Sequence, residues 1–137
     1  KWLRKIAEGP MVVAYGATEP NAGSNLAALR TTADPVRDAS GTITHYKLNG
    51  VKQFITNGGI ADLYTILART PNGPSFFAIE KGTPGLLPGR TEEKHGIRAS
   101  NTAQVVLRTR SSPSRTCSAW RRARASRTPR RSSPTPA

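Results

Sequence analysis

Short apolar runs, most of them closed by glycine or proline, follow one another from Pro10 to Leu107 with no helical period between them. Runs of this length, rich in β-branched and aromatic residues, are typical of strands. Their even spacing predicts an all-β fold, a small antiparallel barrel or sandwich. The segment is long enough for one modest β core. Strands are expected at residues 11–15, 29–33, 42–48, 51–56, 62–70, 75–81, 87–94 and 103–107.

Two of these runs meet at Asn49-Gly50. An Asn-Gly dipeptide between strand-like runs is the strongest short-range signal for a hairpin, because both residues tolerate a positive φ. We therefore expect a tight turn there, with residues 42–48 and 51–56 paired as antiparallel neighbours.

The first residues follow a helical pattern instead. Residues 2–8 read as the last turns of an α-helix, which Gly9 ends and Pro10 cannot continue. Because the chain lacks an initial Met and opens inside this helix, we expect a fragment of a longer protein. Three parts are expected: the end of an N-terminal helical domain at 1–9, a β domain at 10–108 and a tail at 109–137.

Charge is concentrated in that tail. Residues 1–107 hold twelve Lys/Arg and eight Asp/Glu, whereas residues 108–137 hold nine Arg and no acidic residue. A basic end favours nucleic-acid contacts, but this one lacks lysine, a fold motif and aromatics other than Trp120. We expect an Arg/Ser/Pro-rich, disordered tail and no nucleic-acid partner. The remote alternative, a basic nucleic-acid-binding β domain, predicts salt-dependent binding that survives removal of the tail.

Several kinds of site find no support in the sequence. Cys117 is the only cysteine, so an internal disulfide is impossible and an oxidising compartment is not implied. No apolar run reaches the ~18 residues that cross a bilayer. His45 and His95 show neither metal-ligand spacing nor a nucleophile–base pattern, so neither is assigned a metal or catalytic role.

Two segments carry most of the chemical information. Residues 15–24 leave a strand through small residues, a kind of loop that lets backbone N–H groups and hydroxyls approach a ligand. In residues 49–58, Phe54 and Thr56 share one face of a strand. A flat heterocycle with polar edges could lie on Phe54 while Thr56 and Thr18 hold those edges. Taken singly, the first segment is also consistent with a simple turn and the second with core.

In their order and separation, these segments resemble the flavin-binding middle domain of the acyl-CoA dehydrogenases. That family carries Thr-Glu-Pro-x-Ala-Gly-Ser, then an Asn/Ser-Gly-x-Lys-x-aromatic-Ile-Thr-Asn-Gly hairpin. An aromatic-rich strand leading to Thr-Pro-Gly follows, and then a Glu-x-Lys-x-Gly-x-Arg-x-Ser-x-Thr run before a last strand. The resemblance extends from Lys1 to about Arg108. Its motifs lie at residues 18–24, 49–58, 83–85 and 93–102.

This resemblance implies FAD as the cofactor and suggests roles by position. The first segment would wrap the flavin, with the Ala17 backbone and the Thr18 hydroxyl near its pyrimidine end. Phe54 would lie against the ring and Thr56 would hydrogen-bond near flavin N5, while Ser24 would also meet acyl-CoA. The expected cofactor-binding residues are Tyr15, Ala17, Thr18, Gly23, Ser24, Phe54, Ile55 and Thr56, of which Ser24 is also substrate-binding.

The resemblance also implies a parent enzyme that oxidises acyl-CoA thioesters to 2,3-enoyl-CoA and forms a homo-oligomer. Electron-transferring flavoprotein would accept its electrons, in the bacterial cytoplasm or, for a eukaryotic protein, the mitochondrial matrix. An acyl-CoA oxidase or a related flavoenzyme on the same scaffold is the alternative. The catalytic base of the family lies in a C-terminal helical domain, so no catalytic residue is assigned here. Phe54 where Trp is usual, and Asn25 where Asp is common, leave the acyl-chain preference open.

A shift of one base in the gene explains the tail. From Thr109 onward, shifted codons can give Asp-Ala-Val-Val-Pro-Val-Glu-Asn-Leu-Leu-Gly-Val, similar to the exit strand and first helical residues of the family. Cys117 and Trp120 constrain this reading, because codons for both begin with TG. We therefore hypothesise a frameshift or sequencing error just after Leu107.

Overall fold

The short helix α1 (Trp2–Glu8) ends immediately before Gly9 and Pro10, as the sequence predicts. The structure is a computed structural model that describes residues 2–108, with side chains from Arg4 onward. The predicted tail at 109–137, and its expected disorder, lie outside the described residues. After α1 come β1 (Val13–Gly16), the 3₁₀ turn η1 (Leu26–Ala28), β2 (Thr32–Arg37), β3 (Ile43–Thr56), β4 (Leu63–Thr70), β5 (Gly73–Glu80), β6 (Leu86–Thr91) and β7 (Thr102–Leu107).

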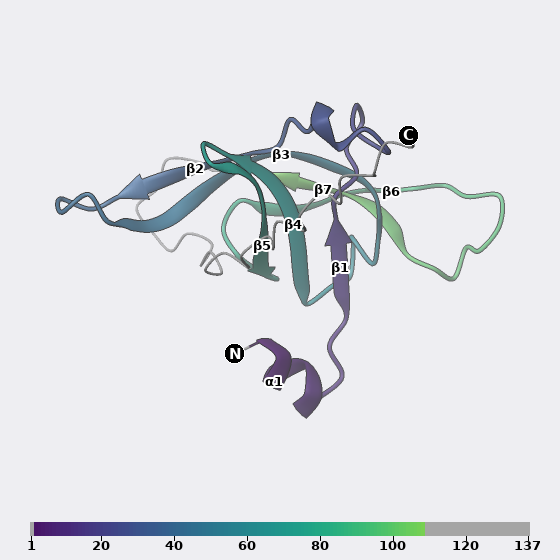
Figure 1. Cartoon of the computed structure of the whole chain (residues 1–137). Helices are drawn as coiled ribbons and strands as arrows, with labels where there is room; N and C mark the ends of the chain where they lie inside the picture. The colour runs from purple at the N-terminus through teal and green to yellow at the C-terminus, as the bar shows by residue number, and fades with distance from the viewer. Residues whose placement is uncertain (1, 109–137) are drawn as a thin grey trace, which may run out of the picture.

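In the described part of the chain, seven strands form one hydrogen-bonded sheet, which confirms the predicted all-β class (Figure 1). The strand order is β1-β4-β2-β3-β7-β6, and β5 also pairs with β4. Most pairings are antiparallel as predicted, but β1 runs parallel to β4, and Thr32 pairs in parallel with Arg69. The long path through β2 and β3 makes this possible, because parallel neighbours need a crossover of a dozen or more residues.

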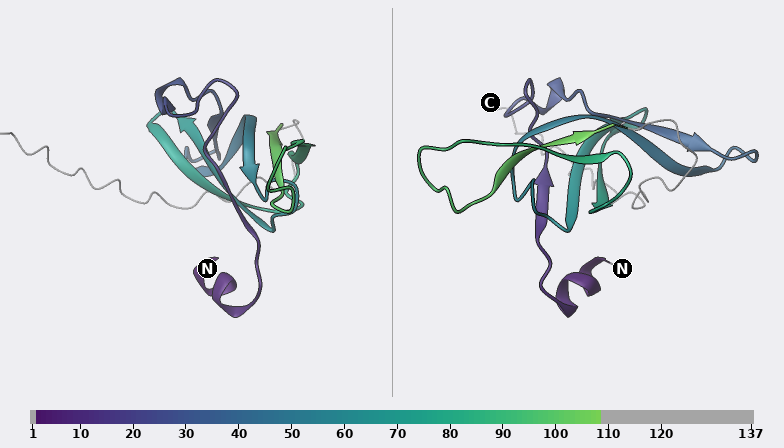
Figure 2. Two further views of the ribbon diagram at one scale, coloured as in Figure 1. Left: turned by 90° about the vertical axis from the view of Figure 1, so that its right-hand side faces the viewer. Right: turned by 180° about the vertical axis from the view of Figure 1, so that it is seen from behind.

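The sheet bends so that β1, β4 and β5 form one layer and β3, β7 and β6 another (Figure 2). Apolar side chains from both layers make one core cluster, which excludes water from the space between them. Tyr46 of β3 packs edge-on against Phe77 of β5, with ring centroids 5.2 Å apart. The fully buried members of the cluster include Ala14, Ile66, Ile79 and Val105.

The predicted hairpin turn at Asn49-Gly50 is wrong, because β3 runs through both residues without interruption. The first half of β3 pairs with β2, and its second half pairs with β7. Gly50 lies where β3 passes from one partner to the other, with φ at 154°. A Cβ at this position would lie 2.8 Å from Cα of Thr31. The glycine thus serves a close backbone approach rather than a turn.

The predicted strand at 29–33 is displaced toward the C-terminus. Residues 26–28 form η1 instead, and β2 contains Asp34 and Pro35, which lie beyond the end of the predicted strand. Asp34 lies opposite Lys47, and Pro35 lies opposite Tyr46. Beyond Thr32, the described pairings of β2 are with β3 alone, so the missing N–H of proline disrupts no second ladder.

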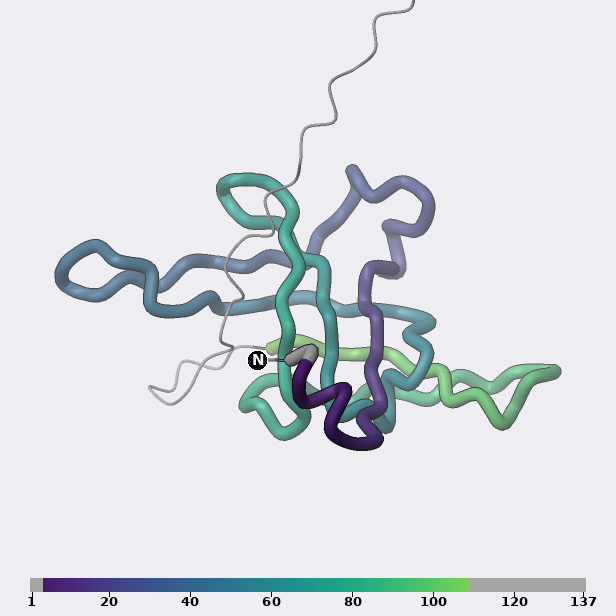
Figure 3. Tube along the Cα trace, turned by 60° about the horizontal axis from the view of Figure 1, so that its bottom comes forward, coloured from purple at the N-terminus to yellow at the C-terminus, as the bar shows by residue number. Residues whose placement is uncertain are grey.

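Two arms extend from opposite sides of the core (Figure 3). One is the β2–β3 hairpin, whose turn is held by Asp38 Oδ1 accepting from the N–H groups of Ser40 and Thr42. The other is the connection between β6 and β7, which we call the 92–101 arm. In this arm, Lys94 Nζ donates to the carbonyls of Ile97 and Ser100, and to Thr102 Oγ1. The two predicted site segments lie between the arms.

Candidate functional site

β1 brings the first predicted segment to the edge of the core. Tyr15 points outward with 61% of its surface exposed, and its ring centroid lies 5.6 Å from that of Phe76 on β5. Gly16 points inward, where a Cβ would lie 2.6 Å from Ile66 Cδ1. Because that space is filled, a side chain at position 16 would require the buried end of Ile66 to shift.

The loop of residues 17–24 is closed by its own backbone. The N–H of Glu19 donates to the carbonyl of Ala22 over 2.9 Å, and the N–H of Ala22 donates back over 3.1 Å. Ala22 is buried, whereas Gly23 and Ser24 are exposed at the far end of the loop and Thr18 is half-buried. The exposed part therefore offers a small residue and a hydroxyl to solvent.

The second segment contains a β-bulge in β3. Lys52 pairs with Val105 and Ile55 with Ala103, so three steps along β3 match two along β7. The extra residue changes the alternation of faces: Lys52 is fully buried, whereas Phe54 is 60% exposed. Phe54 also has a φ of 57°, a region that is unusual for a bulky residue. Such strain is found at functional sites more often than elsewhere.

Beyond the bulge, the predicted residues separate into exposed and buried positions. Thr56 is exposed like Phe54, while Ile55 between them is only 2% exposed and belongs to the core. The side chain of Ile55 therefore packs inward, and only its backbone remains for a ligand.

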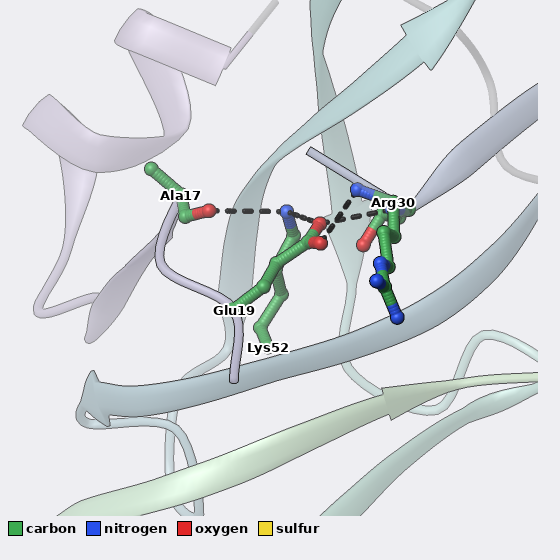
Figure 4. Close-up of polar contacts among 5 residues, drawn as sticks. Ala17, Glu19, Arg30 and Lys52 are labelled. Atoms are coloured by element: carbon green, nitrogen blue, oxygen red, sulfur yellow. Dashed lines mark hydrogen bonds and ion pairs between the residues drawn. The ribbon is translucent and has the colours of Figure 1, made fainter. Parts of the chain in front are cut away.

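A buried ion pair joins the two segments (Figure 4). Lys52 Nζ lies 2.8 Å from Glu19 Oε1 and donates a second hydrogen bond to the carbonyl of Ala17 over 3.2 Å. The Glu19 carboxylate also accepts from the N–H of Arg30 over 2.7 Å and from the N–H of Thr31 over 3.0 Å. The carboxylate thus ties the loop both to β3 and to the segment that enters β2.

These contacts shift the pKa values of both partners. Burial alone raises the pKa of Glu19, but hydrogen bonds from Lys52, Thr31 and Arg30 outweigh it and bring this pKa below its ordinary value. For Lys52, burial lowers the pKa, and the carboxylate of Glu19 opposes that shift. Charged and neutral forms of Lys52 are therefore closer in free energy than for a lysine in water.

Hydrogen bonds to backbone carbonyls also join the two segments. The N–H of Gln53, inside the bulge, donates to the carbonyl of Thr18 over 3.0 Å. On the next turn, Asn57 Nδ2 donates to the carbonyl of Val13 over 3.3 Å. The structure therefore places Thr18 beside the bulge that carries Phe54. It places Tyr15 against Phe76, and it places Gly23 and Ser24 at the exposed end of the loop.

Glu19 and Lys52 were not predicted as site residues. Each belongs to one of the two motifs, and each is the only charged residue of its motif. A charged residue within an otherwise apolar strand is rarely buried without a partner. The sequence signal for this pair is therefore a single charge within each motif, which predicts a partner of opposite charge elsewhere in the chain.

Other parts of the described chain show fewer features of a binding site. A hollow of about 520 Å³ in the 92–101 arm is lined by residues 91–94 and 98–101, none of which belongs to the predicted site. His45 is half-buried on β3 and His95 is exposed. Among residues 2–108, no group of three or more His, Cys, Asp or Glu is arranged to hold a metal ion. No helix in the same residues has the length and apolarity needed to cross a membrane.

Comparison with known proteins identifies relatives of this chain. Residues 14–109 match the family model described as acyl-CoA dehydrogenase, middle domain. A short-chain-specific acyl-CoA dehydrogenase of Clostridium acetobutylicum is 46% identical over 112 residues, which cover 78% of this chain and 28% of that enzyme. The human mitochondrial very long-chain specific acyl-CoA dehydrogenase is 43% identical over 117 residues, covering 78% of this chain and 17% of that enzyme.

A solved structure shows the same fold. The glutaryl-CoA dehydrogenase of Mycobacterium smegmatis in complex with FADH2 matches with a TM-score of 0.67 and 40% identity. The match covers 78% of this chain and 26% of that one. The chain thus spans less than a third of the length of each of these three relatives.

Proposed function

This chain belongs to the acyl-CoA dehydrogenase family, of which it carries the middle domain, and we propose that it supplies part of the flavin and acyl-CoA site of such an enzyme. In this proposal residues 10–108 are the middle domain, and residues 1–9 are the end of a preceding helical domain. The relative from Mycobacterium smegmatis was solved with FADH2, which supports FAD as the cofactor.

One observation carries the proposal: the exposed ring of Phe54 lies on a strained bulge that is hydrogen-bonded to the loop containing Thr18. An exposed aromatic ring can stack on a flat heterocycle. The hydroxyls of Thr18 and Thr56 can each donate or accept a hydrogen bond, which suits the mixed donors and acceptors along the edge of a flavin. The residues present therefore fit the group.

Each residue has a defined task in this proposal. Phe54 covers one face of the ring and excludes water from it, while Thr18 and Thr56 orient its polar edge. Gly23 and Ser24 let the loop lie close to the cofactor and to the substrate thioester. FAD, when bound, accepts the hydride that leaves the β-carbon of the acyl-CoA. No acidic residue of this chain is assigned as the base that removes the α-proton.

The substrate and the partners are proposed only as general classes. The two curated relatives are named for short-chain and very long-chain substrates, so we propose acyl-CoA without a chain length. Electron-transferring flavoprotein as electron acceptor and a homo-oligomeric assembly are part of the same proposal. An acyl-CoA oxidase is the alternative, because the two classes differ in oxygen access rather than in these motifs.

A titration with FAD tests the proposal. Fluorescence anisotropy of FAD is measured against increasing concentrations of the chain, for the wild type and for Thr56→Val. Loss of one hydrogen bond, about 0.5–1.5 kcal/mol, weakens binding by about two- to tenfold. Thr91→Val is the matched control, since Thr91 is exposed on β6 outside the site. Equal binding by both variants would refute the role of Thr56, and no binding by the wild type would refute the proposed cofactor site.

A further inference from the structure

The Lys52–Glu19 pair is more deeply buried than stability alone explains. The Lys52 side chain is 0% exposed and that of Glu19 is 3% exposed. Removing two charges from water is costly, and an apolar pair of similar volume is often at least as stable. A buried ion pair is therefore weak evidence of a stabilising role. The directional hydrogen bonds of this pair do, however, fix the positions of the groups that they join.

Those hydrogen bonds converge on the backbone around Thr18. Lys52 Nζ reaches the carbonyl of Ala17, one residue before Thr18, and the carboxylate of Glu19, one residue after it. The Thr18 carbonyl itself accepts from the N–H of Gln53, the neighbour of Lys52. Three successive residues of the loop are thus bonded to two successive residues of β3.

The same lysine fixes the other side of the site. The bulge between Lys52 and Ile55 turns the lysine into the core and the ring of Phe54 to the outside. Lys52 and Ile55 lie three positions apart and both face the core, which an alternating strand allows only if it bulges between them, and this bulge leaves Phe54 outside at a φ of 57°. One side chain therefore links the position of the Thr18 hydroxyl to the presentation of Phe54.

We propose that Lys52 and Glu19 are positioning residues of the flavin site, which set the spacing between Thr18 on the loop and Phe54 and Thr56 on β3. The inference rests on the proposed function, because it concerns how that site is held. Neither residue touches the cofactor in this proposal. They act through the backbone that the buried pair holds.

A double variant removes the pair without leaving a buried charge. Glu19→Gln keeps a carbonyl oxygen that accepts from the N–H of Arg30 or Thr31, and Lys52→Met replaces the ammonium by an apolar chain of similar length. Lys81→Met, on an exposed lysine, is the matched control. A second variant, Glu19→Asp, keeps both charges and shortens the acceptor arm, so the loop is drawn toward β3 without loss of the ion pair.

The measurements are the thermal midpoint, the dissociation constant for FAD and the visible absorption spectrum of bound FAD, on the full 137-residue chain. We expect the double variant to unfold within a few degrees of the wild type. Its FAD affinity should be about tenfold to a hundredfold weaker, because the hydrogen bonds from Thr18 and Thr56 to the cofactor are misaligned together. The flavin bands of the residual complex should shift, since the ring and its hydroxyl partners no longer align. Glu19→Asp should show a smaller change of the same kind, and Lys81→Met none.

The outcomes separate the inference from the function on which it rests. A folded double variant with wild-type affinity and spectrum overturns the positioning role and leaves the flavin site standing. If the double variant does not fold, Glu19→Asp decides: an unchanged affinity and spectrum overturn the inference, and a weaker, shifted complex supports it. A wild-type chain without FAD binding overturns the proposed function, and the inference with it.

Discussion

Replacing Gly50 by alanine should strongly destabilise the protein. A Cβ at position 50 would lie 2.8 Å from Cα of Thr31 and in contact with Thr31 Oγ1, and backbone cannot yield as a flexible side-chain end does. Overpacking of this kind costs about 1–3 kcal/mol. The φ of 154° lies in a region that is essentially restricted to glycine and adds a backbone cost of about 1–2 kcal/mol for a residue with a Cβ. Gly50→Ala should therefore lower the free energy of unfolding by about 2–5 kcal/mol.

Urea and thermal unfolding, followed by circular dichroism, give this difference directly. For a domain of this size a loss of about 2–5 kcal/mol lowers the thermal midpoint by about 10 °C or more. Gly41→Ala is the first control: its φ is 81°, but no atom lies within 4 Å of the added Cβ, so only the backbone cost applies. Gly23→Ala is the second, with neither cost.

The comparison with Gly41→Ala decides between two structures. If Asn49-Gly50 were the tip of an exposed hairpin, the two substitutions would have equal effects, since both would change only the backbone preference of a turn. Equal effects would therefore refute the continuous β3 and its contact with Thr31.

Three further predictions concern the ion pair, the bulge and the 92–101 arm. Glu19→Gln leaves Lys52 without its anion and should lower stability by about 3–5 kcal/mol near pH 7. Because the folded pKa of Glu19 lies below its ordinary value of 4.5, wild-type stability should fall as pH drops below 4.5, and urea unfolding should show a flatter acid limb in the variant. Phe54→Asn should raise stability by about 1 kcal/mol, because Asn tolerates the positive φ, while FAD binding weakens; a loss of stability in urea would contradict the assigned strain. Lys94→Met removes three donated hydrogen bonds and should speed amide exchange in residues 97–102, whereas unchanged exchange would refute that anchoring role.

Features set by local chemistry could be predicted from the sequence. The end of α1 at Gly9-Pro10 depends only on those two residues. The predicted strands at 62–70 and 103–107 are observed at Leu63–Thr70 and Thr102–Leu107, because apolar runs and flanking turn residues define them.

Features that depend on contacts between residues far apart in the sequence could not be predicted in this way. Asn49-Gly50 carries a strong turn signal, and the approach of Thr31 from an earlier segment decides its conformation instead. The parallel pairing of β1 with β4 depends on how the intervening chain is routed. The same holds for the candidate site. Its exposed members were identified from motifs, whereas the bond between Glu19 and Lys52 spans 33 positions, so the charge within each motif does not identify its distant partner.

The frameshift hypothesis for residues 109–137 is tested on the DNA sequence and not on the fold. Reading the DNA from the codon of Leu107 onward tests the frameshift hypothesis. A long helical frame opened by restoring one base would support it. A confirmed frame that ends after Ala137 would make the Arg-rich segment genuine, and deletion of residues 109–137 would then be the test for nucleic-acid binding.

Titration of the ¹⁵N-labelled chain with FAD, followed by amide chemical shifts, tests the flavin site most directly, because weak binding is also visible in this way. The account predicts saturable shifts at residues 15–24 and 53–57, where the loop meets the bulge of β3. They should be absent from the β2–β3 arm and reduced in the Glu19→Gln/Lys52→Met variant. No shifts at millimolar FAD, or shifts confined to the 92–101 arm, would contradict it.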